Sequence, residues 1–166
     1  MERLTYAFYH RHALEVAPEL VGKLLVYNGK ALRISETEAY CGTADTACHA
    51  HKGRTPRTEV LYADAGTVYV NLCYGVHWLM NIITGDAEDP QGVLIRACLE
   101  AEGPGKLTRA LGITGAQNRA NAVTSDQIWI ADDGFRGSVR TAPRIGIGYA
   151  APEDQAKPWR FLLDQT

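Results

Sequence analysis

The chain has 166 residues, of which 46% are hydrophobic and 22% charged, and its formal net charge is −2 at pH 7. This length suits one compact domain with a proper core and is too short for two ordinary ones. The near-neutral charge excludes a surface that is basic throughout, so a nucleic-acid surface would have to be a local patch. Three basic clusters are candidates for such a patch: His10-Arg11-His12, the run from His49 to Arg57, and Arg136 with Arg140 and Arg144.

Targeting and metal motifs are weak in this sequence. The first twelve residues are charged and aromatic, unlike a signal peptide, and no apolar run reaches membrane-spanning length. We therefore expect a cytoplasmic protein, associated with the nucleoid if the source is bacterial, with no membrane partner. The four cysteines lack the paired spacing of zinc or redox motifs. Cys48-His49-Ala50-His51, with Cys41 nearby, is the only candidate metal cluster and fits no standard site, so we expect reduced thiols, no metal and no cofactor.

The first part of the chain predicts a helix and a hairpin. Leu14, Ala17 and Leu20 recur at helical spacing and indicate an amphipathic helix over residues 13–22, although Pro18 interrupts it. The period then changes to two. Residues 23–27 and 31–40 are predicted to be strands joined at Asn28-Gly29, because both turn residues accept positive φ.

The rest of the chain adds a long loop and more strands. Residues 42–58 are rich in Gly, Thr, Asp and Pro, which indicates a functional loop. Strands are predicted over 67–74, 76–83 and 91–99, followed by a short helix over 105–111 with Pro104 at its start. Further strands are predicted over 128–131, 144–149 and 159–163. The expected class is α+β, a single domain over 1–166 around a mainly antiparallel sheet.

Residues 34–40 form the most informative strand. Alternation places Glu36, Glu38 and Tyr40 on one side and the intervening small residues on the other. Two carboxylates beside a tyrosine are unsuited to a core face. A cleft is favoured, where apolar neighbours that raise a carboxylate's pKa would suit it to act as a general base.

Tyr74 stands before Gly75 at the predicted meeting point of two strands. A bulky aromatic at a turn tip is poorly placed to bury itself against the sheet. It would be available as a wedge that fills the gap left by an extruded nucleotide. The alternative is a tyrosine folded back on the sheet edge.

Several motifs in order resemble the alkyladenine (3-methyladenine, or methylpurine) DNA glycosylase family. They are Glu36-Thr37-Glu38-Ala39-Tyr40, Arg54-Thr55-Pro56-Arg57, Tyr74-Gly75, Met80-Asn81, Val93-Leu94-Ile95-Arg96-Ala97, Gly103-Pro104-Gly105-Lys106-Leu107 and Arg144-Ile145-Gly146-Ile147-Gly148. The resemblance implies a curved antiparallel sheet and a monofunctional DNA glycosylase that starts base-excision repair. Its partner would be double-stranded DNA carrying alkylated or deaminated purines, and we expect it to act as a monomer.

Matched positions assign roles to particular residues. The resemblance implies that Glu38 activates a water, with Arg96 holding the carboxylate and that water. It places Tyr40, His49, Asn71 and Asn81 around the base, with Asn81 crowding the exocyclic amino group of guanine. It makes Tyr74 the intercalating residue and gives Arg54 and Arg57 contacts to DNA phosphates.

One position departs from the family pattern. Asn71 stands where the family usually carries a second aromatic residue that completes the stack around the base. Base–aromatic stacking is worth about 1–3 kcal/mol per base. We therefore expect weaker capture of neutral lesions, such as hypoxanthine or ethenoadenine, than of cationic alkylpurines.

Purely structural roles are also open to three of these residues. Arg96 could pair with Glu36 or Glu100, Asn81 could satisfy backbone groups, and His49 could be an ordinary loop residue. For the whole chain, the competing hypotheses are a non-catalytic protein that binds damaged DNA and a carbohydrate hydrolase using Glu36 and Glu38. Nothing beyond the spacing of those two carboxylates, about 7 Å along the strand, supports the second.

Overall fold

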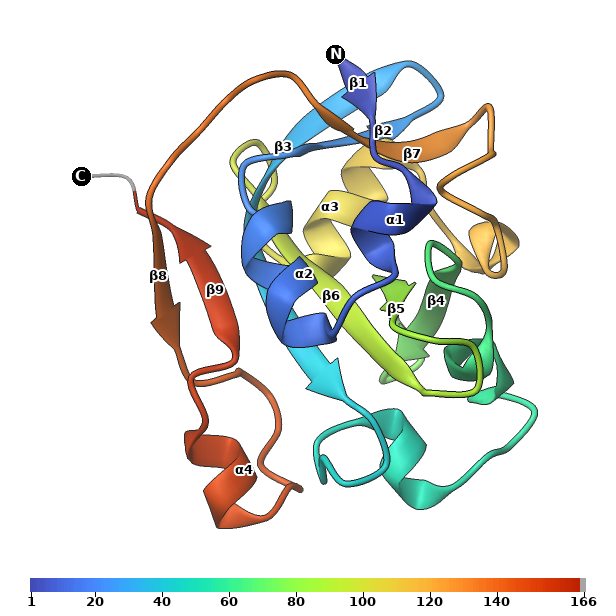
Figure 1. Ribbon diagram of the computed structural model, residues 1–166, viewed down its shortest axis with the longest axis vertical. Coiled ribbons are helices and arrows are strands. Elements are labelled where there is room, and N and C mark those ends of the chain that lie inside the picture. Colours follow the sequence, from blue (N-terminus) through green and yellow to red (C-terminus); the bar gives the residue numbers. More distant parts are fainter. Residues whose placement is uncertain (165–166) are drawn as a thin grey trace.

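Antiparallel strands form one curved sheet in the computed structural model, which describes residues 1–164 (Figure 1). The path through the sheet is β1-β7-β2-β3-β6-β5-β4, and a hairpin of β8 and β9 joins it through β3. The strands are β1 (Glu2–Arg3), β2 (Leu24–Tyr27), β3 (Lys30–Cys41), β4 (Val68–Cys73), β5 (His77–Thr84), β6 (Gln91–Cys98), β7 (Ile128–Asp132), β8 (Val139–Ala142) and β9 (Arg160–Leu163). The predicted α+β class with a mainly antiparallel sheet is confirmed.

Short helices accompany the sheet. The α-helices are α1 (Tyr6–Tyr9), α2 (Ala13–Leu20), α3 (Pro104–Leu111) and α4 (Pro152–Ala156), and the 3-10 turns are η1 (His49–Lys52), η2 (Glu59–Tyr62) and η3 (Gly115–Gln117). The predicted helices over 13–22 and 105–111 correspond to α2 and α3. Helix α3 starts at Pro104, where a missing N–H costs nothing, and ends at Gly112 in the left-handed conformation (φ 85°).

Strand β3 is the centre of the sheet because it has partners on both edges. Residues 34–41 pair with β6, while the opposite edge pairs first with β2 and then, over residues 36–38, with β9. The hairpin between β2 and β3 turns at Asn28 and Gly29, with φ of 48° and 81°, as the sequence predicted.

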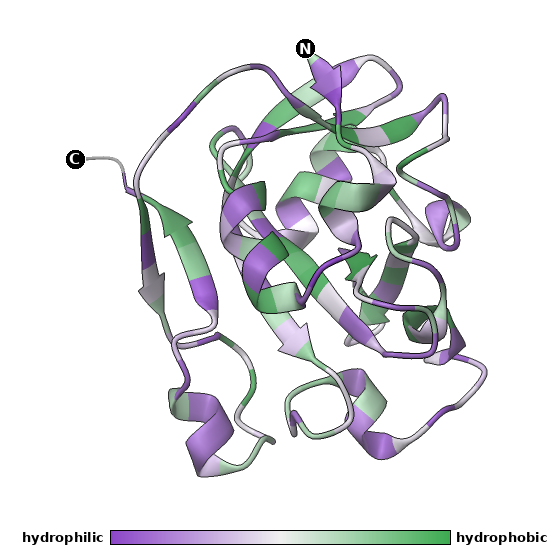
Figure 2. Cartoon of the chain, in the orientation of Figure 1, coloured by the Kyte–Doolittle hydropathy of each residue, from purple (hydrophilic) through white to green (hydrophobic). Residues whose placement is uncertain are grey.

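The two faces of the sheet have different characters. One face packs with α2 and α3 into the main core, which includes Leu20, Met80, Ile82, Ile95 and Leu107. Hydrophobic residues are concentrated on the central strands, whereas α4 is largely hydrophilic (Figure 2). The second face carries polar and aromatic residues of β3, β4, β5 and β6, and the candidate site forms there.

The prediction of a strand over 144–149 is wrong. These residues form an irregular loop between β8 and α4, whereas the hairpin partner of β9 is β8, which the sequence did not predict. Ile145, Ile147 and Tyr149 alternate with Gly146 and Gly148, and Gly146 adopts φ 75°. That conformation is incompatible with a regular strand.

Candidate active site

Strand β3 carries Glu38 into a cleft on the second face of the sheet. Glu38 is only 1% exposed and its Cα is paired with Leu94 of β6 and Arg160 of β9. Thr37 and Ala39 face the opposite way, since the Thr37 hydroxyl donates to the Ala17 carbonyl and Ala39 lies in the main core. The predicted alternation along this strand is therefore present. The Glu36 carboxylate forms an ion pair with Arg160 at 2.7 Å. It is therefore not the partner of Arg96.

Three groups orient the Glu38 carboxylate. The Tyr40 hydroxyl donates to Oε1 over 2.8 Å, and the backbone N–H of Ile145 donates to Oε2 over 2.8 Å. Arg96 Nε lies 3.4 Å from Oε2. The pairing register of β3 and β6 shifts beside Arg96, and such a bulge redirects the side chain of the extra residue. The ion pair of Arg96 is thus with Glu38, and not with Glu36 or Glu100.

Burial controls the protonation of this carboxylate. Loss of solvent raises the pKa of Glu38, while the Ile145 N–H, the Tyr40 hydroxyl and the charges of Arg96 and Arg144 oppose that rise. Burial and the neighbouring Glu38 raise the pKa of Tyr40 well above its ordinary value, so its hydroxyl remains a donor. A carboxylate whose pKa is shifted upward toward neutrality is a stronger base than one in water.

Arg144 packs against Tyr40, which lines the pocket. Its guanidinium donates to both oxygens of Asp45 and to the Ala39 carbonyl, and its Cζ lies 5.0 Å from the centroid of Tyr40 and 4.9 Å from that of Trp159. Because Arg144 is buried, it cannot belong to a DNA-binding patch, and Arg136 is engaged with Asp132. The patch predicted from Arg136, Arg140 and Arg144 is therefore wrong.

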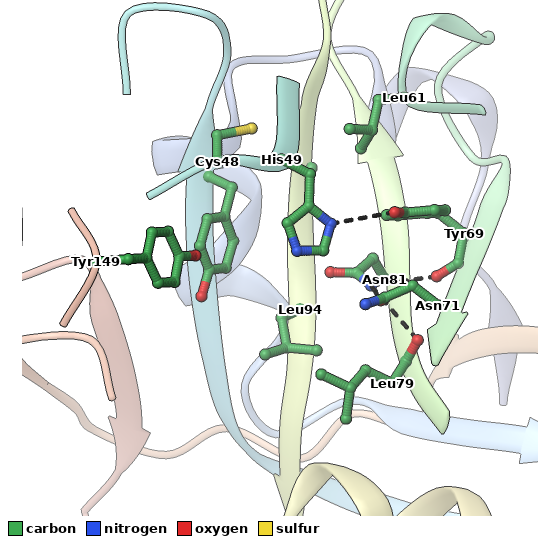
Figure 3. A pocket seen from close by; sticks show the side chains of 11 residues that line it. Cys48, His49, Leu61, Tyr69, Asn71, Leu79, Asn81, Leu94 and Tyr149 are labelled. Atoms are coloured by element: carbon green, nitrogen blue, oxygen red, sulfur yellow. Dashed lines mark hydrogen bonds between the residues drawn. The ribbon is translucent and has the colours of Figure 1, made fainter. Parts of the chain in front are cut away.

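His49 lines the same pocket as Tyr40. Its Nδ1 is 3.1 Å from the hydroxyl of Tyr69, and the two rings meet edge to face (Figure 3). Burial and the nearby positive charges of Arg57 and Lys52 lower the pKa of His49. The ring is therefore neutral at physiological pH and does not repel a cationic ligand.

Asn71 and Asn81 line the same pocket, beside Tyr69 and Leu79 (Figure 3). Asn71 is 6% exposed. Asn81 Nδ2 donates to the Tyr69 carbonyl and to Asn71 Oδ1, each over 3.2 Å. Asn81 thus both satisfies a backbone group and faces the pocket.

Tyr74 occupies the tip of the hairpin between β4 and β5. It is 91% exposed and adopts φ 52°, and the Val76 N–H closes the turn on the Cys73 carbonyl. Positive φ is unfavourable for a tyrosine, so the tip carries both backbone strain and a solvated aromatic ring. The ring borders a cleft of about 520 Å³ that also contains Glu38 and Arg96, and it is not folded onto the sheet edge.

The cations around the cleft differ in their availability. Arg57 is exposed and donates to the Leu72 carbonyl, with no carboxylate partner among residues 1–164. Arg54 is bound by Glu59 and Glu88 and stacks on Tyr62. Arg54 thus ties its own loop to the loop that carries Glu88, and two carboxylates already engage its charge.

Sequence reasoning missed several residues of the site. Ile145 contributes a backbone N–H, which no side-chain motif reports, and Tyr149 lines the pocket from the loop that was predicted to be a strand. Lys106 and Arg109 of α3 line the cleft beside Tyr74. Their spacing of three on a helix that begins with Gly-Pro-Gly was the available signal, because it places both on one side.

A buried, hydrogen-bonded carboxylate at the base of an aromatic pocket is typical of enzymes that use acid–base chemistry. The chain belongs to the methylpurine-DNA glycosylase family, whose profile matches residues 7–102 and 99–166. It is thus an enzyme of the DNA glycosylase type, a hydrolase of N-glycosyl bonds that functions in DNA repair.

Curated relatives cover nearly the whole chain, and each carries the name "Putative 3-methyladenine DNA glycosylase". The protein of Anaeromyxobacter dehalogenans is 42% identical over 97% of this chain and 83% of its own length. That of Methanocella arvoryzae is 42% identical over 93% of this chain and 88% of its own. That of Desulfitobacterium hafniense is 38% identical over 100% of this chain and 97% of its own. Within residues 1–164, no helix has the length and apolar character needed to cross a membrane.

Proposed function

We propose that this chain is a monofunctional DNA glycosylase that extrudes an alkylated or deaminated purine from duplex DNA and hydrolyses its N-glycosidic bond. The observation that carries the proposal is the Glu38 carboxylate, which is buried beneath the aromatic pocket and fixed by donors from Tyr40 and Ile145. A surface carboxylate would not need such fixing, whereas a base that must receive a proton at one defined point does.

Capture of the base begins at the hairpin tip. Tyr74 enters the duplex and occupies the space of the extruded nucleotide, which offsets part of the lost stacking. Lys106 and Arg109 line the cleft and Arg57 lines an adjoining pocket that shares His49 and Tyr149 with it. These cations hold the phosphates, and the enzyme acts as a monomer on double-stranded DNA. The extruded base stacks between Tyr40 and the neutral ring of His49.

Glu38 then performs the hydrolysis together with one water. The bond between C1′ and the base nitrogen breaks with its electron pair going to the base, and charge develops on the sugar in an oxocarbenium-like state. The water oxygen bonds to C1′ while one of its protons passes to Glu38. Arg96, 3.4 Å from the carboxylate, holds Glu38 and the water in line. A cationic alkylpurine leaves as a neutral base, so its departure needs no added proton.

A water nucleophile implies that no Schiff base forms, and strand cleavage at the abasic site should be absent. The sequence placed only Lys52 near the pocket motifs, but the structure adds Lys106 to the cleft. Borohydride reduction during turnover should yield no covalent protein–DNA adduct. An adduct that forms with the wild type but not with Lys106→Met would show that the Lys106 amine, and not water, is the nucleophile.

The decisive experiment compares abasic-site formation by three proteins on methylated duplex DNA. The wild type should produce alkali-labile sites, and Glu38→Gln should reduce their rate by about 10²–10⁴-fold, as expected for loss of a general base. Glu36→Gln is the matched control, because Glu36 lies on the same strand face but pairs with Arg160. Equal rates for Glu38→Gln and Glu36→Gln would refute the assigned role of Glu38.

The competing hypothesis is a non-catalytic protein that binds damaged DNA. Tight binding by the wild type without any abasic sites would support it. The two hypotheses also differ in binding: a protein that reads distortion should tolerate Tyr40→Ala, whereas an enzyme that captures the extruded base should bind damaged DNA more weakly without the Tyr40 ring.

A further inference from the structure

A short turn after β3 holds both ends of the C-terminal loop, residues 143–151, which joins β8 to α4. Near the start of the loop, Asp45 of the turn forms an ion pair with Arg144. At the end of the loop, the Thr46 hydroxyl accepts a hydrogen bond of 2.9 Å from the backbone N–H of Ala151. Two points that lie far apart along the loop are thus held by two neighbouring residues of the turn.

The Thr46 hydroxyl also connects the turn to helix α4. It donates to the carboxylate of Asp154, and the same oxygen accepts the backbone N–H of Thr46 over 3.0 Å. Asp154 is buried, and Lys157 Nζ lies 2.8 Å from its other oxygen. Because a hydroxyl can donate and accept at the same time, Thr46 holds both the helix and the end of the loop that precedes it.

The C-terminal loop needs this second attachment because the first one acts through a long side chain. The guanidinium of Arg144 is fixed, but several rotatable bonds separate it from its own backbone. Gly146 and Gly148 follow, and glycine allows the backbone more conformations than other residues do. A loop held only through Arg144 could pivot about that side chain. The bond from Ala151 to Thr46 involves the backbone itself and therefore restrains the segment between the two attachments.

That segment contains a backbone group of the candidate active site. The Ile145 N–H donates to Glu38 Oε2 over 2.8 Å. Ile147 belongs to a small apolar cluster that packs against Tyr40, whose hydroxyl is the donor to the other oxygen of Glu38. Movement of the C-terminal loop would therefore disturb both donors to this carboxylate.

We propose that Thr46 is a positioning residue for the hydrolysis, because its hydroxyl holds the C-terminal loop where the Ile145 N–H orients Glu38. This inference rests on the proposed glycosylase function. Within residues 1–164, Thr46 is not among those that line the aromatic pocket, the cleft or the adjoining pocket of Arg57. Its substitution should therefore change the rate of hydrolysis and not the binding of DNA.

The pH dependence of the rate distinguishes this role from a merely structural one. The Ile145 N–H favours the ionised form of Glu38 and opposes the rise of its pKa. Loss of this donor would raise the pKa of Glu38 further, because burial would then act with less opposition. The acidic limb of the pH–rate profile should move to higher pH.

The other groups around Glu38 keep their charge over the range of the test. Within residues 1–164, the ionisable groups that act on Glu38 are Tyr40 on its own strand, Arg96 on β6, and Arg144 and Tyr149 in the C-terminal loop, while Arg160 on β9 is engaged with Glu36. Arginine side chains stay charged throughout, and burial raises the pKa of both tyrosines above its ordinary value of 10.0. A shift of the acidic limb therefore reports Glu38.

The test measures single-turnover release of bases from methylated duplex DNA between pH 4.5 and 8. Four proteins are compared. Thr46→Val removes the hydroxyl at nearly the same volume, whereas Thr46→Ser retains it. Thr43→Val is the matched control, because Thr43 is an exposed residue of the same loop and the chemical change is identical. Binding of damaged duplex is measured in parallel by gel-shift titration.

Thr46→Val should release bases about 10–100-fold more slowly than the wild type on the acidic side of the profile, since a small misplacement of a catalytic group has effects of this size. Its acidic limb should lie at higher pH, and its affinity for damaged duplex should be unchanged. Thr46→Ser and Thr43→Val should behave like the wild type. An acidic limb of Thr46→Val at the wild-type pH, or equal slowing by serine and valine, would overturn the inference.

A second measurement needs no DNA and is therefore independent of the proposed function. Exchange of the Ile145 amide hydrogen with solvent is followed by NMR in the folded proteins. It should be about 10-fold or more faster in Thr46→Val than in the wild type and unchanged in Thr46→Ser, while amides of β5 and β6 exchange alike in all proteins and show that the fold is intact. Equal exchange of Ile145 in Thr46→Val and the wild type would contradict the role of Thr46. Failure of the wild type to release any base would contradict the proposed function, and the amide exchange would still decide whether Thr46 holds the loop.

Discussion

Arg144 and Asp45 form a buried ion pair that is joined by two hydrogen bonds of 2.7 and 3.0 Å. Asp45 lies in the loop after β3, and Arg144 lies in the loop before α4. The next residue, Ile145, donates its N–H to Glu38. The ion pair therefore fixes the C-terminal loop where it completes the site, although neither partner reaches the pocket centre.

Asp45→Asn should destabilise the protein by about 3–5 kcal/mol, because it leaves the Arg144 charge buried without its counterion. Urea unfolding followed by circular dichroism measures this change. Glu19→Gln is the matched control, since it removes a carboxylate from an exposed pair with Arg11 and should change stability by less than about 1 kcal/mol. Similar losses of stability in both variants would show that the buried pair stabilises the protein no more than the exposed pair does.

The rate of base release should rise with pH through the pKa of Glu38. Only the ionised carboxylate can take a proton from water, and burial raises the pKa of Glu38 above its ordinary value of 4.5. The acidic limb should therefore lie at a higher pH than an exposed glutamate would give. Single-turnover release between pH 4.5 and 8 locates it. A rate that is constant over this range would contradict the role of Glu38 as base.

The same raised pKa makes a prediction about stability. Between pH 4.5 and the raised pKa, the unfolded chain releases the Glu38 proton while the folded protein retains it, so folding loses stability as pH rises. Glu38→Gln has no such proton. The melting temperature of Glu38→Gln minus that of the wild type should therefore increase with pH above 4.5 and then level off. A difference that fails to increase over this window would contradict the raised pKa.

Tyr74→Gly should separate DNA capture from folding. Glycine adopts the local φ of 52° without strain and the lost ring is 91% exposed, so stability should stay equal or rise by up to about 1 kcal/mol. Release of damaged bases should nevertheless fall by about 10-fold or more, because nothing fills the duplex. Asn28→Gly, at another positive-φ turn position, should leave release unchanged. Wild-type release rates with Tyr74→Gly would eliminate the wedge.

Asn71→Tyr should improve excision of neutral lesions. A ring at position 71 adds stacking worth about 1–3 kcal/mol, and neutral bases depend on it most because they are poorer leaving groups than cationic ones. Hypoxanthine and ethenoadenine release should rise about 10-fold or more, while release of 3-methyladenine should change less. Equal release of neutral lesions by both proteins would contradict this expectation.

Local patterns were sufficient to predict much of the fold. Asn28-Gly29 defined the hairpin of β2 and β3, and the β-branched runs defined β4, β5 and β6. The loop over 144–149 was mispredicted because its apolar residues alternate as they would in a strand. Its actual conformation depends on contacts of Arg144 with Asp45, 99 positions away, which a local pattern does not contain.

Some residues of the candidate site could also be predicted from local sequence, and others could not. Glu38 and Tyr40 could be placed together because the period of a strand puts residues two apart on one face. The surroundings of Arg54 could not be predicted, because its partner Glu88 comes from another loop. The contributions of Ile145 and Tyr149 were also hidden, since one acts through its backbone and both depend on tertiary structure.

The separation of 107 positions between Glu38 and Ile145 has a consequence for biosynthesis. Ribosomes add about 5–20 residues per second, so the carboxylate is made roughly 5–20 s before the amide that orients it. During that interval the nascent chain contains the strand with Glu38 but not the loop that covers it. The proposed catalytic centre is therefore complete only after Ile145 has been synthesised.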